Sequence, residues 1–108
     1  MNFPKNNYRI SEEEVNAVLE SIARQIAAPK SNETFGVDVV ARVHGWAYYH
    51  TWDKSKRITY FNKDAIWQAI PVIKENGWHV WAYTDYQDEL SIWITASSVC
   101  PHPWYRKL

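Results

Sequence analysis

The features that most often reveal a protein's chemistry are scarce in this chain of 108 residues. Its one cysteine, Cys100, has no partner for an internal disulfide. Lysine and arginine number 12, and so do aspartate and glutamate, which gives a formal net charge of zero. Without net charge, no overall field draws the protein to nucleic acid or to an anionic membrane. We therefore expect neither of these as a partner.

Long apolar runs are also missing. No stretch approaches the ~18 consecutive apolar residues that are needed to cross a bilayer. The first ten residues, MNFPKNNYRI, lack the apolar centre of a secretion signal. Together with the single cysteine, these absences predict a protein of the reducing cytoplasm.

Motifs of catalysis and metal binding are absent as well. The three glycines, Gly36, Gly45 and Gly77, are too dispersed for a phosphate-binding loop. The histidines and Cys100 lack the Cys-x-x-Cys and His-Glu-x-x-His spacings that are typical of zinc sites. Cys100 and His102 alone do not make a nucleophilic site, which also needs an oxyanion hole and an orienting group. We expect no enzymatic activity, no metal and no cofactor.

Aromatic residues, in contrast, are abundant: the chain has seven Trp, seven Tyr and three Phe. Rings at this density must either fill a core or coat a binding surface. The length suits one domain with its own core. We treat residues 1–108 as a single domain, with an extended lead-in at 1–9 and an extended C-terminal tail at 98–108.

The clearest helix signal follows the lead-in. Ser11 is a suitable N-cap, and Glu14 three residues later completes a capping box. Pro29 ends the pattern, so we predict a helix over residues 12–28. Its apolar stripe recurs at helical spacing and consists of Val15, Val18, Leu19, Ile22 and Ile26.

The next segment favours strands. Four valines in seven residues predict a strand over residues 37–44, although a helix here stays an open alternative. An unbroken strand from residue 37 to residue 52 would span ~50 Å, so Gly45 is expected to form a bulge, a bend or a helix end. Residues 46–52 and 57–61 then read as the two arms of a hairpin.

A second helix is predicted over residues 63–76, where apolar residues again recur at helical spacing. Pro71 lies inside this pattern and predicts a kink, because proline lacks the N–H that the helix needs. Gly77 is expected to end the helix, with Trp78 packed on Ile73.

The stretch from residue 78 to residue 96 alternates as two strands joined by a polar turn. One face of the resulting hairpin is aliphatic and suits a core. The other face carries large rings together with hydroxyl groups. We therefore predict an α+β fold with a mainly antiparallel sheet of four to five strands, built from two hairpins. An N-terminal helix precedes the sheet, and a kinked helix lies between the hairpins.

The aromatic sheet face is the main candidate for a binding site. Its predicted members on the two hairpins are Trp46, Tyr48, His50, Trp52, His79, Trp81, Tyr83 and Trp93. Two interpretations stay open. Helix 12–28 covers these rings as a second core, or it packs beside helix 63–76 and leaves them exposed as an interface.

The exposed-face interpretation leads to a hypothesis about function. We expect a small cytoplasmic binding protein, of the inhibitor, adaptor or immunity type, that contacts a partner protein or a second copy of itself through this face. The alternative is a small-ligand protein whose Trp/Tyr cleft stacks a nucleotide or a sugar. The basic turn at Lys54, Lys56 and Arg57 is too small to indicate nucleic-acid binding.

Overall fold

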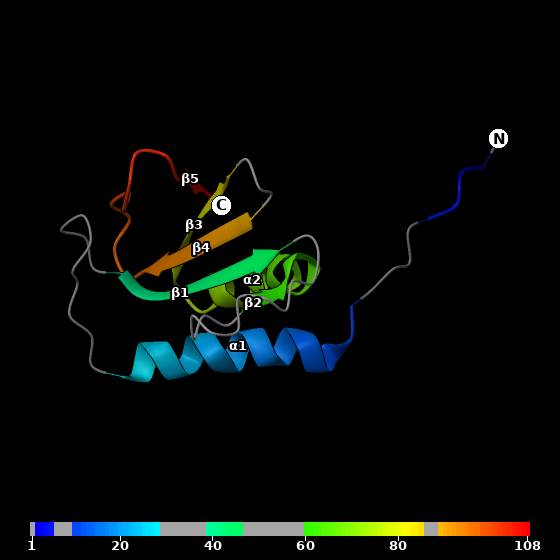
Figure 1. Ribbon diagram of the computed structural model, residues 1–108, viewed down its shortest axis with the longest axis horizontal. Helices are drawn as coiled ribbons and strands as arrows, with labels where there is room; N and C mark the ends of the chain where they lie inside the picture. Colours follow the sequence, from blue (N-terminus) through cyan, green and yellow to red (C-terminus); the bar gives the residue numbers. More distant parts are fainter. Residues whose placement is uncertain (1, 6–9, 29–38, 47–59, 86–88) are drawn as a thin grey trace.

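The computed structural model describes residues 2–5, 10–28, 39–46, 60–85 and 89–108 (Figure 1). Within these ranges the chain forms two helices and a five-stranded sheet, which confirms the predicted α+β fold. In chain order the elements are α1 (Glu12–Ala27), β1 (Val39–Trp46), β2 (Tyr60–Asn62), α2 (Lys63–Glu75), β3 (His79–Thr84), β4 (Glu89–Thr95) and β5 (Arg106–Lys107).

The strands lie in the order β2-β1-β4-β3-β5. The central pairs are antiparallel, and the predicted second hairpin is confirmed as β3 and β4, with Trp81 opposite Trp93. β5, within the predicted C-terminal tail, adds to the free side of β3. The sheet is therefore mostly antiparallel.

The first predicted hairpin differs from the structure. Most of its two arms, residues 46–52 and 57–61, lies outside the described residues. The part that is described, β2, pairs with β1 in parallel, with His44 opposite Tyr60. A parallel pair needs a connection of about a dozen residues or more, and residues 47–59 supply one. Parallel pairing therefore replaces the expected antiparallel return.

The two helices begin as the sequence predicts. At α1 the Ser11 hydroxyl accepts the Glu14 backbone N–H at 3.3 Å, and this hydroxyl also lies 3.1 Å from the Glu14 carboxylate, to which it donates. At α2 the Asn62 side chain accepts the Asp64 backbone N–H at 2.8 Å. Each cap satisfies one N–H that has no partner inside its helix.

The second helix also ends as predicted, at a glycine. α2 runs through Pro71, whose kink stays a prediction, to Glu75. Gly77 then takes a φ of 89°, a left-handed conformation that glycine adopts without steric cost. Its N–H donates to the Lys74 carbonyl at 3.0 Å and satisfies a helix-end acceptor.

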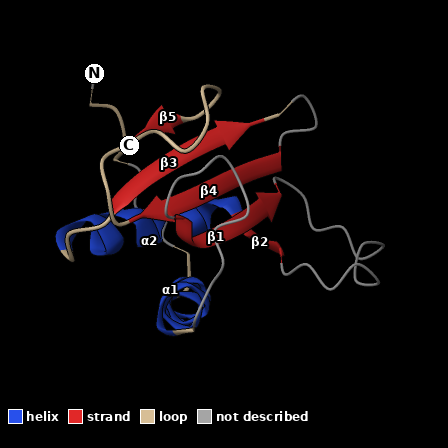
Figure 2. Ribbon diagram, turned by 90° about the vertical axis from the view of Figure 1, so that its left-hand side faces the viewer, coloured by secondary structure: helices blue, strands red, loops and turns tan. Residues whose placement is uncertain are grey.

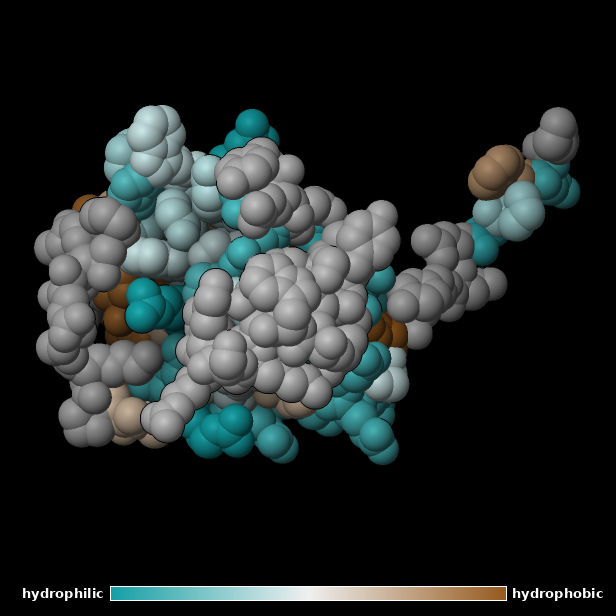
Figure 3. All heavy atoms as spheres, viewed as in Figure 1, coloured by the Kyte–Doolittle hydropathy of each residue, from teal (hydrophilic) through white to brown (hydrophobic). Residues whose placement is uncertain are grey.

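Both helices lie on the same face of the sheet (Figure 2). The core between the helices and the sheet includes Val18 of α1, Ile66 of α2 and Ile92 of β4, all at most 1% exposed. The outer surface of α1, along the lower edge of Figure 3, is largely hydrophilic. α1 therefore packs beside α2 and does not cover the aromatic face.

Residues 39–46 form a strand, as the valines favoured, but the expectation for Gly45 was wrong. The register shift in β1 falls between Val39 and Ala41, and the pairing with β4 runs unbroken through Gly45. Within the described ranges, no helix is long and apolar enough to cross a membrane.

Candidate functional site

Two rings of the predicted aromatic face are covered, one on each strand of the β3–β4 hairpin. Trp81 and Trp93, which pair across β3 and β4, are each only 6% exposed, whereas Tyr83 is 39% exposed. Large rings buried this far contribute to folding and are closed to a partner. For Trp81 and Trp93, the structure therefore supports the interpretation as a second core.

The cover is the C-terminal segment, residues 97–108, and not α1. The Tyr105 ring centroid lies 5.1 Å from that of Trp93 and 5.6 Å from that of Tyr83, within the range of favourable ring pairs. The Tyr105 hydroxyl lies 3.1 Å from Ser91 Oγ, with which it forms a hydrogen bond. Burial raises the pKa of Tyr105, and the bond to Ser91 acts in the opposite direction.

Polar atoms beneath this segment also have partners. Trp81 Nε1 donates to Thr95 Oγ1 at 2.9 Å, and the fully buried Thr95 hydroxyl donates to the Ser97 carbonyl at 2.7 Å. On the outside, Lys107 Nζ lies 5.8 Å from the centroid of the Trp81 ring, a cation–π distance. The rings and the segment thus form a small second core with its hydrogen bonds satisfied.

One histidine of β1 has a ring nitrogen that is buried. His44 of β1 makes an edge-on contact with Tyr60, with 6.2 Å between ring centroids, and its Nδ1 lies 3.4 Å from Glu89 Oε1. That Nδ1 is buried and forms no hydrogen bond with any residue that the structure describes. Burial, and then the charge of Arg42, lower the pKa of His44. The Glu89 carboxylate does not make hydrogen-bond geometry with Nδ1, so the effect of burial prevails and His44 is neutral at pH 7.

Of the remaining predicted site residues, the structure describes His79 and the backbone of Trp46. His79 is half-buried and lies opposite Thr95. Trp46 ends β1, and its backbone lies opposite Glu89. The other three predicted members of the face, Tyr48, His50 and Trp52, lie outside the described residues.

Among the described residues, no three His, Cys, Asp or Glu side chains gather as a metal site would require. The exposed Cys100 thiol donates to the His102 carbonyl at 2.9 Å. His102 Nδ1 accepts the Trp104 backbone N–H at 3.3 Å. These bonds shape the C-terminal segment locally.

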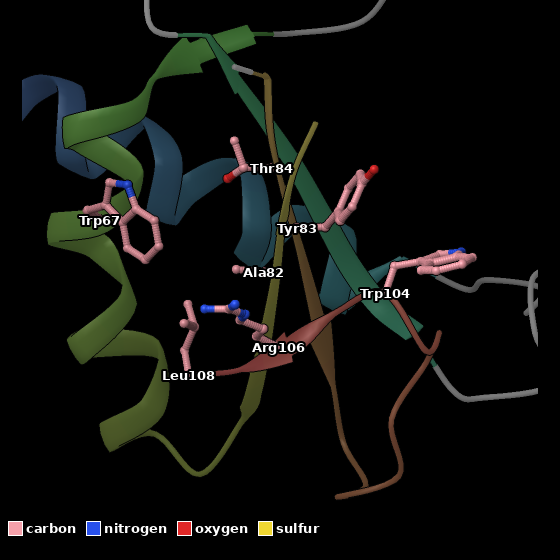
Figure 4. Close-up of a pocket in the computed structure, with 7 residues that line it drawn as sticks. All are labelled: Trp67, Ala82, Tyr83, Thr84, Trp104, Arg106 and Leu108. Carbon is pink, nitrogen blue, oxygen red and sulfur yellow. The ribbon is translucent and has the colours of Figure 1, made fainter. Parts of the chain in front are cut away.

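A groove at the outer edge of β3 is the candidate functional site (Figure 4). It has a volume of about 510 Å³ and lies between α2 and the C-terminal segment. The residues lining the groove are Trp67, Ala82, Tyr83, Thr84, Trp104, Arg106 and Leu108. Among the predicted site residues whose side chains the structure describes, this groove includes Tyr83 alone.

Three exposed rings surround the groove. Trp67 is 43% exposed and Trp104 is 68% exposed, close to Tyr83 at 39%. Figure 4 shows Trp67 on the helix side of β3, and Tyr83 and Trp104 on the opposite side. Arg106 supplies the one charged side chain among the seven lining residues. The groove therefore offers ring surface on both sides of a strand edge, with the Arg106 cation on the helix side.

Sequence reasoning missed Trp67 and Arg106, although Trp67 carried a signal. Trp67 directly follows Ile66, one of the buried residues of α2, and so projects away from the helix's apolar stripe. A large ring off the apolar stripe is typical of a surface that meets another molecule. Arg106 had no such signal, because only the pairing of β5 with β3 places it in the groove.

Comparisons with protein-family models, with curated proteins and with solved structures found no match for this chain. The chemistry of the groove is therefore what indicates a function.

Proposed function

We propose that this chain is a small binding protein that holds a partner protein in the groove beside β3. The observation that carries the proposal is the exposure of Trp67, Tyr83 and Trp104 around Arg106, while Trp81 and Trp93 of the sheet are covered. Tryptophan, tyrosine and arginine are the residues that contribute most to protein–protein interfaces. The exposure of these three rings to water at one place favours a role in binding over a role in folding.

The geometry of the groove suits a protein partner. Trp67 comes from α2, Tyr83 from β3 and Trp104 from the C-terminal segment, so packed elements hold the rings in place. Fixed rings lose little conformational freedom on binding, which favours affinity. Inhibitors, adaptors and immunity-type proteins all act through such a surface. A second copy of the chain is one partner that this chemistry fits.

Site-directed crosslinking tests the proposal. A photoreactive benzoylphenylalanine replaces Trp67 or Trp104 in the groove, and Glu20, exposed on α1, serves as the control position. After irradiation in native cell extract, we expect both groove positions to capture the same protein and Glu20 to capture none of it. Failure of both groove positions, or equal capture at Glu20, would contradict the proposal.

The volume of the groove also favours a second candidate function. Small-molecule pockets commonly have volumes of about 300–1,000 Å³ and are lined by aromatic rings, and this groove has a volume of about 510 Å³. Trp67 and Tyr83 could then stack a nucleotide or a sugar. A saturable rise in melting temperature with a panel of nucleotides and monosaccharides, lost in Trp67→Ala, would favour this alternative.

A further inference from the structure

One part of the groove is a niche between α2 and β5. Arg106 of β5 lies opposite Ala82 of β3, and side chains directly opposite in an antiparallel pair project to the same face of the sheet. Ala82 belongs to the core between the sheet and the helices, so Arg106 faces α2 as well. Trp67 lies on this same side of β3 (Figure 4). Thr84 and Leu108, each two residues along the strand from this pair, complete what we call the helix-side niche.

The niche contacts a guest through side chains, because the backbone beside it is already paired. The Leu108 N–H donates to the Val80 carbonyl at 2.9 Å, and β5 pairs with β3 at Ala82. A guest therefore does not join the sheet along this stretch. The methyl group of Ala82 is the smallest of the lining side chains and leaves the space above it to the guest.

Arg106 gives the niche its charge. It is exposed, and it is the one charged side chain among the seven residues that line the groove. Among the described residues, it forms no ion pair with a carboxylate side chain. Guanidinium groups bind carboxylates through two parallel hydrogen bonds, so a carboxylate is the natural complement of Arg106.

Trp67 gives the niche a ring. Its side chain is 43% exposed, although the helix that carries it packs on the sheet. Ala82 and Leu108 add apolar surface beside this ring. Pairs of aromatic rings contribute more to binding than the apolar area that they bury. An aromatic side chain of a partner is therefore the natural complement of Trp67.

We propose that the helix-side niche takes two adjacent residues of a partner protein, one acidic and one aromatic. The acidic side chain pairs with the Arg106 guanidinium, and the aromatic ring packs on Trp67 above Ala82. The partner segment adds no strand to β3. Tyr83 and Trp104, on the opposite side of β3, contact the partner beyond this pair. This inference rests on the proposed function and specifies the partner's chemistry.

Size and charge favour this pair over a nucleotide, which also combines a ring with an anion. The groove volume of about 510 Å³ suits a guest the size of a small drug, and two capped residues have that size. One guanidinium matches the two oxygens of a carboxylate. A terminal phosphate carries about two negative charges and three acceptor oxygens, and in this groove it meets a single cationic side chain.

The test titrates the isotope-labelled full chain with capped dipeptides and follows its amide and indole N–H signals by NMR. N-acetyl-Asp-Phe-amide and N-acetyl-Phe-Asp-amide present the pair in both orders. We expect at least one of them to bind saturably, with a dissociation constant of about 1 mM or below, and to shift the Trp67 indole signal. Asn in place of Asp, or Ala in place of Phe, should weaken binding about tenfold. Adenosine monophosphate should bind more weakly than the better dipeptide.

Matched variants of the protein assign the two contacts. Arg106→Gln should remove the preference for Asp over Asn. Lys107→Gln should keep it, because Lys107 lies over the Trp81 ring on the opposite face of the sheet. Trp67→Ala should remove the preference for Phe over Ala, and its missing indole signal identifies that of Trp67 in the wild type. Trp104→Ala should keep this preference, since Trp104 lies across β3 from the niche.

Melting curves of each variant establish that it is folded before binding is compared. Absence of saturable binding by both dipeptides up to about 10 mM would overturn this inference. So would an Asp preference that survives in Arg106→Gln, a Phe preference that survives in Trp67→Ala, or tighter binding of adenosine monophosphate. Each of these results leaves the proposed function standing if the crosslinkers at Trp67 and Trp104 still capture a common protein. Failure of that crosslinking alone overturns the proposed function.

Discussion

Gly45 lies in β1 at a point that has no room for a side chain. A Cβ added there would lie 2.5 Å from Ile66 Cδ1 and 3.0 Å from the Phe61 carbonyl oxygen. We expect Gly45→Ala to lower the free energy of unfolding by about 1–3 kcal/mol, because overpacking forces the neighbours apart. Urea denaturation measures this change.

A second substitution tests the cause of that loss. Ile66→Val removes the Cδ1 atom and should by itself cost about 0.5–1.5 kcal/mol. If the clash is with this atom, the Gly45→Ala/Ile66→Val double variant should lose less stability than the two single losses combined. Strict additivity would show that Ile66 is not what excludes a side chain at Gly45.

His44 should make stability depend on pH. Its pKa in the folded protein lies below the ordinary value of 6.5, chiefly because it is buried. As the pH falls through about 6.5, the unfolded chain therefore takes up the proton first, and the folded state loses stability. Above that pH both states hold a neutral imidazole and this loss is absent.

The comparison that isolates this effect is His44→Gln. We expect its free energy of unfolding to fall less than that of the wild type between pH 7.5 and pH 5.5, because the other histidines titrate in both proteins. An equal fall in the free energy of unfolding of both proteins would contradict the lowered pKa of His44. A smaller fall in the wild type would show that Glu89 outweighs burial and stabilises the charged imidazole.

At the scale of elements, Gln25 of α1 completes the edge of β1. β2 begins opposite His44. Two residues earlier in β1, the Arg42 N–H donates to Gln25 Oε1 at 3.0 Å. Gln25 Nε2 returns a bond to the Arg42 carbonyl at 2.9 Å. One amide side chain thus replaces a missing strand partner, as an open sheet edge requires.

We expect Gln25→Ala to lower the free energy of unfolding by about 1 kcal/mol or more, since two backbone groups lose their partner. Amide hydrogen exchange at Arg42 should accelerate, because that N–H becomes accessible to water. Arg24→Ala, one residue earlier on α1, is the control and should leave exchange at Arg42 unchanged. Unaltered exchange at Arg42 in Gln25→Ala would contradict the pairing.

Tyr105 is one of the residues that hold the C-terminal segment on the sheet. Tyr105→Phe loses the hydrogen bond to Ser91 and should cost about 1 kcal/mol, whereas Tyr105→Ala also loses ring packing on Trp93 and should cost about 2–4 kcal/mol. Lifting the segment would expose Trp81 and Trp93 to water, so tryptophan emission should shift to the red in Tyr105→Ala alone. Wild-type stability and emission in Tyr105→Ala would show that the segment is not a cover.

How well the sequence predicts each element depends on how far apart in the chain the interacting residues lie. Ser11 caps α1 and Gly77 ends α2 through bonds to residues three positions away, so local sequence sufficed. The parallel pairing of β2 depends on residues 47–59 and on a strand distant in sequence, which alternation does not reveal. Gln25 was likewise unpredictable, because its partner Arg42 is 17 residues away.

At the scale of the whole molecule, four of the described tryptophans fall into two pairs of different exposure. Trp81 and Trp93 are nearly buried beneath residues 97–108, whereas Trp67 and Trp104 remain exposed along the groove. Alternation in the sequence correctly placed Trp81 and Trp93 on the face opposite the aliphatic core. It could not show that the chain's own C-terminal segment covers them, since that depends on Tyr105 packing across the sheet.

The central claim is that buried rings build the fold and groove rings are free to bind. The most direct test is the free energy of unfolding of Trp93→Ala and Trp104→Ala, measured side by side by denaturant titration. We predict a loss of about 3–5 kcal/mol for Trp93→Ala, because it leaves a cavity, and a change within about 0.5 kcal/mol for Trp104→Ala. A Trp93→Ala protein as stable as the wild type, or a large loss in Trp104→Ala, would contradict the account.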